Sequence, residues 1–199
     1  MWNKMRIKPI FSVLLIFTII LSFLLGMMVS ENMWKCPACI YDSGNIVPLV
    51  NENYFNFTLN EIENAKSKID IVLYEFKFYE TENAATMLRD ALIKKYKEGV
   101  SVRIILDQSE WYGKETELSK SNKQTAKILA ESGIDVKMDS LKRTTHNKLL
   151  IIDDESVIVG SHNWGSSALT KNNEASVYIK DLKTAEYYRN YFEFLWNNT

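Results

Sequence analysis

Residues 145–153 read Thr-His-Asn-Lys-Leu-Leu-Ile-Ile-Asp, and residues 160–164 read Gly-Ser-His-Asn-Trp. Two apolar runs in this region, 149–152 and 157–159, are each bounded by polar residues, which is typical of buried strands. Only residues 153–156 separate the runs, so the two strands must form an antiparallel hairpin. We predict a two-residue turn at Asp154–Glu155, although Asp-Glu is not a favoured pair for such a turn.

The turn sets which residues of the hairpin lie opposite each other. With a two-residue turn, Lys148 opposes Ser161 and His146 opposes Asn163, and directly opposed residues share one face of the sheet. Because strand side chains alternate with period two, these four polar side chains should converge at the open end of the hairpin. Three of them can donate hydrogen bonds to an anion, and an imidazole can act as nucleophile or proton carrier near neutral pH. The hairpin therefore predicts a phosphate site that contains a reactive base.

Two other polar residues of the hairpin have the opposite parity. His162 lies between two of the converging residues, so it should point away from the site, and we interpret it as structural or exposed. Asp153 is offset from His146 by an odd number of residues, so the hairpin does not place it in the site either. A lone histidine in a strand is usually a satisfied core or edge residue. The combination of four polar residues favours a catalytic site over that interpretation.

Together these positions resemble the signature of the phospholipase D superfamily, His-x-Lys-x4-Asp followed after six intervening residues by Gly-Ser-x-Asn. The matching residues are His146, Lys148, Asp153, Gly160, Ser161 and Asn163. The resemblance covers Ile46 to the C-terminus, and Glu174 fits the later acidic residue that orients the catalytic imidazole in the family. One copy of the signature is present. This is similar to the small single-motif members, a bacterial secreted-type endonuclease and the mitochondrial cardiolipin-hydrolase and piRNA-nuclease group.

The resemblance implies a role for each of these residues. His146 would attack phosphorus and form a phosphohistidine. Lys148 and Asn163 would hold the non-bridging oxygens with help from Ser161, and Glu174 would fix the imidazole tautomer. The expected catalytic set is His146, Lys148, Asp153 and Glu174, and the expected phosphate-binding set is Lys148, Ser161 and Asn163.

The implied reaction is a phosphodiester hydrolysis that needs neither a metal nor another cofactor. The chain has two histidines, and the carboxylates near the motif show no recognisable ligand spacing, whereas a lysine and amide donors can neutralise phosphate. A two-step reaction needs two histidines in one site, so we expect a homodimer whose shared active site takes His146 from each chain. Asp153 enters the catalytic set by resemblance alone, and support of the lysine or of the turn is an equal interpretation.

The substrate class is less closely defined. We expect an endonuclease acting on DNA or RNA, because the single-motif relatives favour nucleic acid. The alternatives are a phospholipase D-type hydrolase of membrane phospholipids such as cardiolipin, and an inactive phosphate-binding module. The inactive module is disfavoured because the imidazole and its candidate orienting carboxylate are both present.

Charge restrains the nucleic-acid interpretation. The chain has 24 basic and 25 acidic residues, so without Lys4, Arg6 and Lys8 the remainder has 21 against 25, a net charge of −4. A dedicated duplex binder usually shows a basic excess. Lys142 and Arg143, just before the motif, could form a local basic rim for phosphates or could be ordinary solvated charges.

The N-terminal region predicts a membrane anchor. Residues 9–30 contain no charged side chain and are long enough to cross a hydrocarbon core of about 30 Å as a helix. The run exceeds the roughly 7–15 residues of a signal-peptide core, and no Ala-x-Ala-like site follows, so we favour an uncleaved anchor over a signal peptide. The basic residues in 1–8 place the N-terminus in the cytoplasm and the catalytic domain on the outer side of a prokaryotic plasma membrane.

The segment 31–45 is expected to be a juxtamembrane linker, and it contains both cysteines of the chain, Cys36 and Cys39. A single Cys-x-x-Cys pair cannot complete a four-ligand zinc site. A structural disulfide is the plain interpretation on the oxidising side of a membrane. Zinc shared between two chains is the minor alternative.

Strand and helix patterns alternate along residues 46–199. The expected strands are Ile46–Val50, Ile69–Phe76, Val100–Leu106 and Asn172–Ile179, and the expected helices are Phe57–Lys66, Glu82–Glu98, Lys123–Ser132 and Asp181–Trp196. This alternation predicts an α/β catalytic domain with a mixed, largely parallel β-sheet flanked by helices, in which the antiparallel pair is the hairpin. Residues 107–122 are the expected loop over the site, and its aromatic residues could stack on bases, touch lipid or pack into the core.

Overall fold

The computed structural model describes Ile20, Ser22 and residues 45–79 and 81–199. The chain divides into two compact units, Met1–Ile40 and Tyr41–Thr199, and the sheet and its helices belong to the second. The predicted basic N-terminus, most of the predicted anchor and the C-x-x-C pair lie outside the described residues. Within the described residues, no helix combines the length and the apolar character needed to span a membrane.

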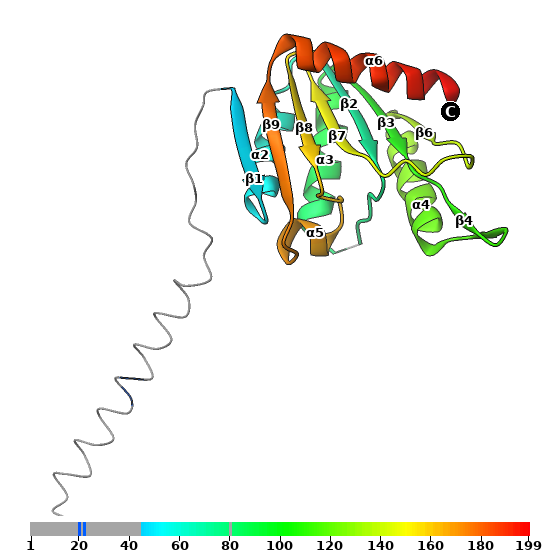
Figure 1. The fold of residues 1–199 in the computed structure, drawn as a ribbon, viewed down its shortest axis with the longest axis horizontal. Coiled ribbons are helices and arrows are strands. Elements are labelled where there is room, and N and C mark those ends of the chain that lie inside the picture. The colour runs from blue at the N-terminus through cyan, green and yellow to red at the C-terminus, as the bar shows by residue number, and fades with distance from the viewer. Residues whose placement is uncertain (1–19, 21, 23–44, 80) are drawn as a thin grey trace, which may run out of the picture. The chain divides into compact units, whose positions relative to one another are not determined.

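Seven strands form one sheet in the order β1-β9-β8-β7-β2-β3-β6 (Figure 1). In chain order they are β1 (Ile46–Val50), β2 (Lys68–Leu73), β3 (Ser101–Leu106), β6 (Asp135–Met138), β7 (Lys148–Ile152), β8 (Ser156–Gly160) and β9 (Ala175–Lys180). A separate small hairpin consists of β4 (Glu110–Trp111) and β5 (Lys114–Glu115). The predicted mixed α/β fold is confirmed, but the sheet is not largely parallel, because four of its six strand pairings are antiparallel.

The two halves of the sheet differ because their connections differ. The parallel strands β2, β3 and β6 are joined by crossovers through α3 (Ala84–Lys97) and α4 (Glu117–Glu131). In contrast, β7, β8 and β9 are joined by a short turn and by a segment that holds only the five-residue helix α5 (Ser166–Thr170). Each of these strands therefore returns antiparallel beside the one before it.

Helices cover both faces of the sheet (Figure 1). Residues of α2 (Asn53–Asn64), α3, α4 and α5 belong to the larger core cluster, whereas α6 (Leu182–Asn198) packs on the opposite face. Side chains of β7 alternate between the two cores: Leu150 points to the larger cluster and Leu149 points to α6. All five residues of β7 are buried, as expected for a central strand.

Capping residues start two of the helices. The Asn83 side chain accepts hydrogen bonds from the N–H groups of Ala85 and Thr86 at the start of α3. The Thr116 hydroxyl accepts one from the Ser119 N–H at the start of α4. Each cap satisfies backbone donors that have no partner within the helix, and so fixes the residue at which the crossover begins.

The register of the central hairpin differs by one residue from the prediction. Ile152 pairs with Ser156, so the turn contains the three residues 153–155 rather than two. Asp153 and Asp154 have φ angles of 52° and 61°, a left-handed conformation that aspartate tolerates better than most residues. A slip of one residue reverses which side chains share a face, so the predicted pairing of Lys148 with Ser161 does not occur.

Candidate active site

Five chain segments meet at one edge of the sheet. Because β7 runs antiparallel to β2 and to β8, the start of β7 lies beside the ends of those two strands. The start of β9 lies beside the end of β8, and the end of β3 lies beside the end of β2, to which β3 is parallel. This edge therefore gathers the polar residues that flank these strands.

His146 is exposed at this edge, two residues before β7. Its Nε2 lies 3.1 Å from Lys148 Nζ, and its ring packs edge-on against Tyr74 with 4.4 Å between the ring centroids. An ammonium can only donate, so this contact makes Nε2 the lone-pair nitrogen and places the proton of a neutral imidazole on Nδ1. His146 thus presents an unprotonated nitrogen beside a cation, which suits attack on an anionic substrate.

Lys148 is only 7% exposed, and its ammonium lies 4.9 Å from the centroid of the Tyr74 ring. Burial lowers the pKa of Lys148, while the charges of Glu174, Glu75 and Asp107 act to raise it. The ammonium therefore lies in the field of these carboxylates, while its own hydrogen-bond contacts are with His146 Nε2 and the His146 carbonyl. A bound phosphate would compete with these carboxylates for the same cation.

Gly160 allows β8 to approach β9 very closely. A Cβ atom at Gly160 would lie 2.2 Å from Ser176 Oγ and 2.3 Å from Ser176 Cα, so no other residue fits without a backbone shift. The next residue, Ser161, donates its N–H to the Ala175 carbonyl over 3.0 Å. Its hydroxyl accepts the Ala175 N–H and donates to Glu174 Oε2. The glycine thereby sets the position of the serine hydroxyl.

Glu174 contacts the serine rather than the imidazole. Its second oxygen, Oε1, accepts from Asn172 Nδ2 over 3.1 Å. Burial acts to raise the pKa of Glu174, but the hydrogen bonds from Ser161 and Asn172 outweigh it and hold the pKa below its usual value. In the described part of the chain neither carboxylate oxygen is hydrogen-bonded to His146, so the expected tautomer contact is not formed within one chain.

Asn163 lines a cavity of about 160 Å³ next to the site, together with Glu75, Lys77 and Tyr79. Its Oδ1 is buried and has no hydrogen-bond partner among the described residues. The following residue, Trp164, fixes the segment because its N–H donates to the Glu75 carbonyl over 2.9 Å. The amide of Asn163 is thus anchored by its neighbour, while its Oδ1 accepts no hydrogen bond from the part of the chain that the structure describes.

His162 is a buried structural residue that points away from the site. Its Nδ1 lies 2.7 Å from Ser176 Oγ and its Nε2 lies 3.1 Å from the Asn51 carbonyl oxygen. The ring also stacks on Tyr54, with 4.0 Å between centroids. Burial lowers the pKa of His162, against the opposing effects of Asn51 and Glu174. The chain leaves strand conformation after residue 160, so strand parity did not decide this orientation.

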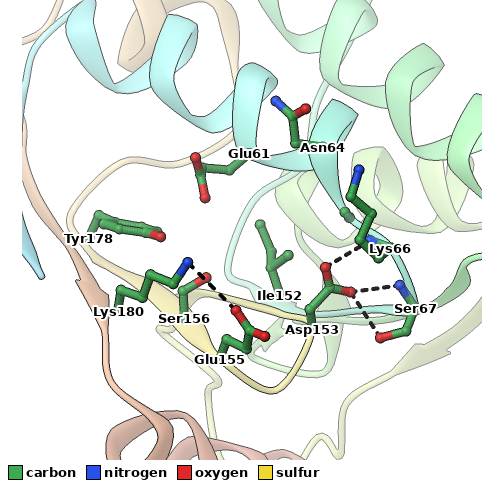
Figure 2. A pocket seen from close by; sticks show the side chains of 11 residues that line it. Glu61, Asn64, Lys66, Ser67, Ile152, Asp153, Glu155, Ser156, Tyr178 and Lys180 are labelled. Atoms are coloured by element: carbon green, nitrogen blue, oxygen red, sulfur yellow. Dashed lines mark hydrogen bonds and ion pairs between the residues drawn. The ribbon is translucent and has the colours of Figure 1, made fainter.

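Asp153 lies at the opposite end of β7 from His146, and the structure does not bring it to the site. Its carboxylate accepts the backbone N–H groups of Lys66, Ser67 and Lys68 over 2.7, 2.7 and 3.0 Å, and the Ser67 hydroxyl over 3.0 Å. Figure 2 shows the contacts of Lys66 and Ser67 with Asp153 beside a cavity of about 450 Å³ that is lined by residues of α2, the β7–β8 turn and β9. Of the two interpretations offered for Asp153, the geometry favours support of the turn.

Two carboxylates that contact Thr145, the residue before His146, were not predicted from the sequence. Asp107 Oδ1 accepts the Thr145 N–H over 2.6 Å, and the Thr145 hydroxyl donates to Asp139 Oδ2. Asp107 and Asp139 are both buried, at the ends of β3 and β6. Each directly follows a strand of the parallel part of the sheet, and that position at the end of a parallel strand is the signal that could have identified them.

An exposed rim of aromatic, apolar and basic side chains projects from the same edge. The predicted loop 107–122 contains the β4–β5 hairpin and the start of α4, and Tyr112 in the hairpin turn is 92% exposed. Leu141 is 55% exposed, and Lys142 and Arg143 beside it are also exposed. Gln108, at the base of the hairpin, donates to the Asp139 carbonyl over 2.5 Å and so ties the two loops together. Among the described residues, no group of three or more His, Cys, Asp or Glu side chains is arranged to hold a metal ion.

Comparison with known proteins extends the resemblance to most of the chain. The family model described as "Cardiolipin synthase, PLD-like domain" matches residues 58–196. Phospholipase D of Rickettsia prowazekii is 34% identical over 137 residues, which cover 68% of this chain and 60% of the relative. Mitochondrial cardiolipin hydrolase of Chlamydomonas reinhardtii is 29% identical over 110 residues, which cover 55% of this chain and 46% of the relative. The chain thus spans at most 60% of the length of these two relatives.

The fold gives the same assignment. The crystal structure of Nuc from Salmonella typhimurium, described as a phospholipase D family member, superposes with a TM-score of 0.63 and 28% sequence identity. The alignment covers 77% of this chain and 95% of Nuc. The family match extends over the hairpin, both halves of the motif and the helices on both faces of the sheet. The chain therefore belongs to the phospholipase D superfamily and carries the family motif once, at His146, Lys148 and Asp153.

Proposed function

We propose that this protein hydrolyses phosphodiester bonds through a phosphohistidine on His146, and that its substrate is DNA or RNA. The observation that carries the proposal is the contact of 3.1 Å between Nε2 of the exposed His146 and Nζ of the buried Lys148. A phosphate oxygen that takes the lysine hydrogen bond would free Nε2 and place it next to phosphorus.

The reaction has two steps, and each needs a second imidazole. In the first, His146 Nε2 bonds to phosphorus while the bond to the leaving oxygen breaks, and that oxygen takes a proton from the partner's His146. In the second, water attacks phosphorus and gives a proton to the partner's His146, and the phosphorus–nitrogen bond breaks. Both imidazoles return to their starting states.

The other site residues have supporting roles in this proposal. Lys148 and the Asn163 amide would hold the non-bridging oxygens, and the lysine would stabilise the charge that develops on them. The Ser161 hydroxyl, fixed between Glu174 and Ala175, would donate to the same anion after Glu174 releases it. No step requires a metal ion, so hydrolysis should continue in excess chelator.

A homodimer would supply the second histidine, because the chain carries one motif and His162 is buried in a structural role. The test mixes wild-type and His146→Ala chains in equal amounts after unfolding and refolds them together. With random assortment, only about a quarter of the dimers keep both histidines, so activity should fall to about a quarter of the all-wild-type level. A fall to half, which follows the wild-type chain concentration, would show that each chain works alone.

Two observations favour nucleic acid as the substrate. The exposed Tyr112 and the exposed basic pair Lys142 and Arg143, on two loops at the same edge of the sheet, are the residue types of the stacking-plus-charge surfaces that bind single strands. In addition, the alignment covers 95% of Nuc, and the small single-motif members of the family, which this chain resembles, favour nucleic acid.

Hydrolysis of a phospholipid is the second candidate. It is favoured by the names of the curated relatives, which include phospholipase D and mitochondrial cardiolipin hydrolase, and by the apolar run of residues 9–30. The predicted anchor would hold the site close to lipid headgroups, with the catalytic domain on the outer side of the membrane.

The deciding experiment offers the purified protein four labelled substrates in excess EDTA: single-stranded DNA, RNA, cardiolipin and phosphatidylcholine. Lys148→Met should abolish turnover of the true substrate. The matched variant Lys183→Met removes an exposed lysine from the start of α6, at the opposite edge of the sheet, and should keep wild-type activity. Cleavage of cardiolipin alone would reverse the order of the two candidates. Activity that requires a divalent metal, or that survives Lys148→Met, would overturn the mechanism.

A further inference from the structure

The segment that delivers His146 to the site is fastened by two buried carboxylates. Asp107 holds the Thr145 backbone N–H over 2.6 Å, and Asp139 holds the Thr145 hydroxyl. Thr145 is itself buried, so the residue directly before the reactive imidazole cannot move freely. The imidazole therefore takes its position from Asp107 and Asp139 as well as from strand β7.

Asp107 is itself rigidly placed. Its backbone N–H donates to the Leu73 carbonyl over 3.0 Å, and its carbonyl accepts from Asn122 Nδ2 over 2.9 Å. The same Asn122 side chain donates to the Tyr74 carbonyl over 2.8 Å, and both Asp107 and Asn122 are completely buried. The carboxylate thus sits on a fixed backbone between the ends of β2 and β3.

One oxygen of this carboxylate is unused. Asp107 Oδ2 is buried and has no hydrogen-bond partner among the described residues. Burial raises the pKa of Asp107, and the charge of Asp139 adds to the rise, whereas the Thr145 hydrogen bond and the charges of His146 and Lys148 lower it. A buried, unpartnered carboxylate oxygen is costly unless a nearby cation compensates it. The two basic groups whose charges act on Asp107 are His146 and Lys148 of the candidate site.

We propose that Asp107 is a positioning residue for His146. One carboxylate oxygen of Asp107 holds the Thr145 backbone, and the charge on the other stabilises the protonated imidazole of His146. The inference rests on the proposed function only in that it takes His146 as the reacting base. In the proposed reaction one His146 must donate a proton to the leaving oxygen, and the charge on Asp107 would stabilise that protonated form.

Several charged groups surround the imidazole, and the test must separate them. Lys148 comes from β7, Asp107 follows β3, Glu75 follows β2, and Glu174 precedes β9. The charges of all three carboxylates act on Lys148, and the charge of His146 acts on Asp107. Tyr74 packs against the ring and carries no charge in its phenol form.

The experiment is a proton NMR titration of the two histidines in the full-length protein. Asp107→Asn keeps an oxygen that can accept from Thr145 but removes the charge, and should lower the titration midpoint of His146 while the His162 signal stays in place. His146→Asn identifies the signals. Asp139→Asn removes the neighbouring charge at the Thr145 hydroxyl and should leave the His146 midpoint near its wild-type value.

An unchanged His146 midpoint in folded Asp107→Asn would overturn the inference, and a lowered midpoint in Glu174→Gln instead would assign the role to Glu174. If Asp107→Asn fails to fold, the carbon-13 signal of the wild-type Asp107 carboxyl decides the matter. It should show a step at the His146 midpoint, and its absence would refute the coupling. The titration needs no substrate, so a protein that shows the shift but cleaves no phosphodiester would disprove the proposed function and leave this inference standing.

Discussion

Replacing Asp153 with alanine should destabilise the fold and leave the chemistry intact, although Asp153 belongs to the family motif. The carboxylate accepts three backbone N–H groups and one hydroxyl from residues 66–68, at the end of β7 remote from His146. Asp154 offers a matched control, because it is an aspartate in the same turn with a similar left-handed backbone, φ 61° against 52°. Its carboxylate pairs with Arg189 instead.

The magnitude follows from what each alanine removes. Alanine in the left-handed region costs about 1 kcal/mol at either position. At Asp153 the four partly exposed hydrogen bonds add about 3 kcal/mol, at roughly 0.75 kcal/mol each. At Asp154 a partly exposed ion pair adds about 0.5 kcal/mol. The two variants should therefore differ by about 2.5 kcal/mol, or roughly 70-fold in the equilibrium constant for unfolding.

The assay is urea unfolding followed by circular dichroism, at pH 7 and again at pH 3. Burial acts to raise the pKa of Asp153, but the N–H groups of residues 66–68 and the Ser67 hydroxyl outweigh it and hold the pKa below its usual value. The ionised carboxylate therefore contributes stability above the unfolded pKa of about 3.9, and this contribution is lost as the pH falls through the lower folded value. The difference between the variants should shrink at pH 3.

Activity per folded molecule is the second readout, and it should stay within about twofold of wild type for both variants. The reasoning would be refuted by an Asp153→Ala protein that unfolds at the same urea concentration as Asp154→Ala but has lost activity by a hundredfold. That result would mean that the carboxylate acts on the chemistry, as the family pattern first implied.

The other two predictions concern the site edge. Burial lowers the pKa of Lys148, and the ammonium loses its charge above that pKa. Activity should therefore fall on the alkaline side of its pH profile, at a pH below the ordinary lysine value of about 10.4. Lys148→Arg should move this alkaline fall to higher pH, and a fall at the same pH would show that another group titrates. Gly160→Ala should lower the free energy of unfolding by about 3 kcal/mol or more, because the new Cβ would overlap both Oγ and Cα of Ser176. Adding Ser176→Gly removes only the overlap with Oγ. A full recovery of the melting temperature in the double variant would therefore contradict the reasoning.

Much of the fold could be predicted from local patterns. The apolar run 149–152 correctly gave a central buried strand, and the helix that contains Leu88 and Leu92 was expected within two residues of its observed bounds. Helix α4 begins six residues earlier than expected, at Glu117, because its first turns are polar and show no apolar period. The Thr116 cap was the available signal, and it precedes the periodic part of the helix.

Sequence patterns led to several residues that the structure brings to the candidate site, but not to the geometry of the hairpin that carries them. The prediction of a two-residue turn was wrong. Asp153 accepts hydrogen bonds from residues 66–68, which are 85 or more positions away in the chain, and these bonds stabilise a three-residue turn. Local turn preference carries no information about such a partner. Ser161 and Asn163 nevertheless lie at the site edge, because the chain leaves strand conformation after Gly160 and strand parity no longer governs it.

The order of the strands explains which site residues a sequence can predict. His146 and Lys148 are two residues apart, and the hairpin connection brings Ser161 to them, so these residues are found from short-range pattern alone. Asp107 is bonded to Thr145 across 38 positions, and it reaches the site because β3 lies parallel to β2, which in turn lies antiparallel to β7. No local pattern records that β2 separates β3 from β7. The residue proposed to position the imidazole is therefore one whose role becomes visible only when the sheet order is known.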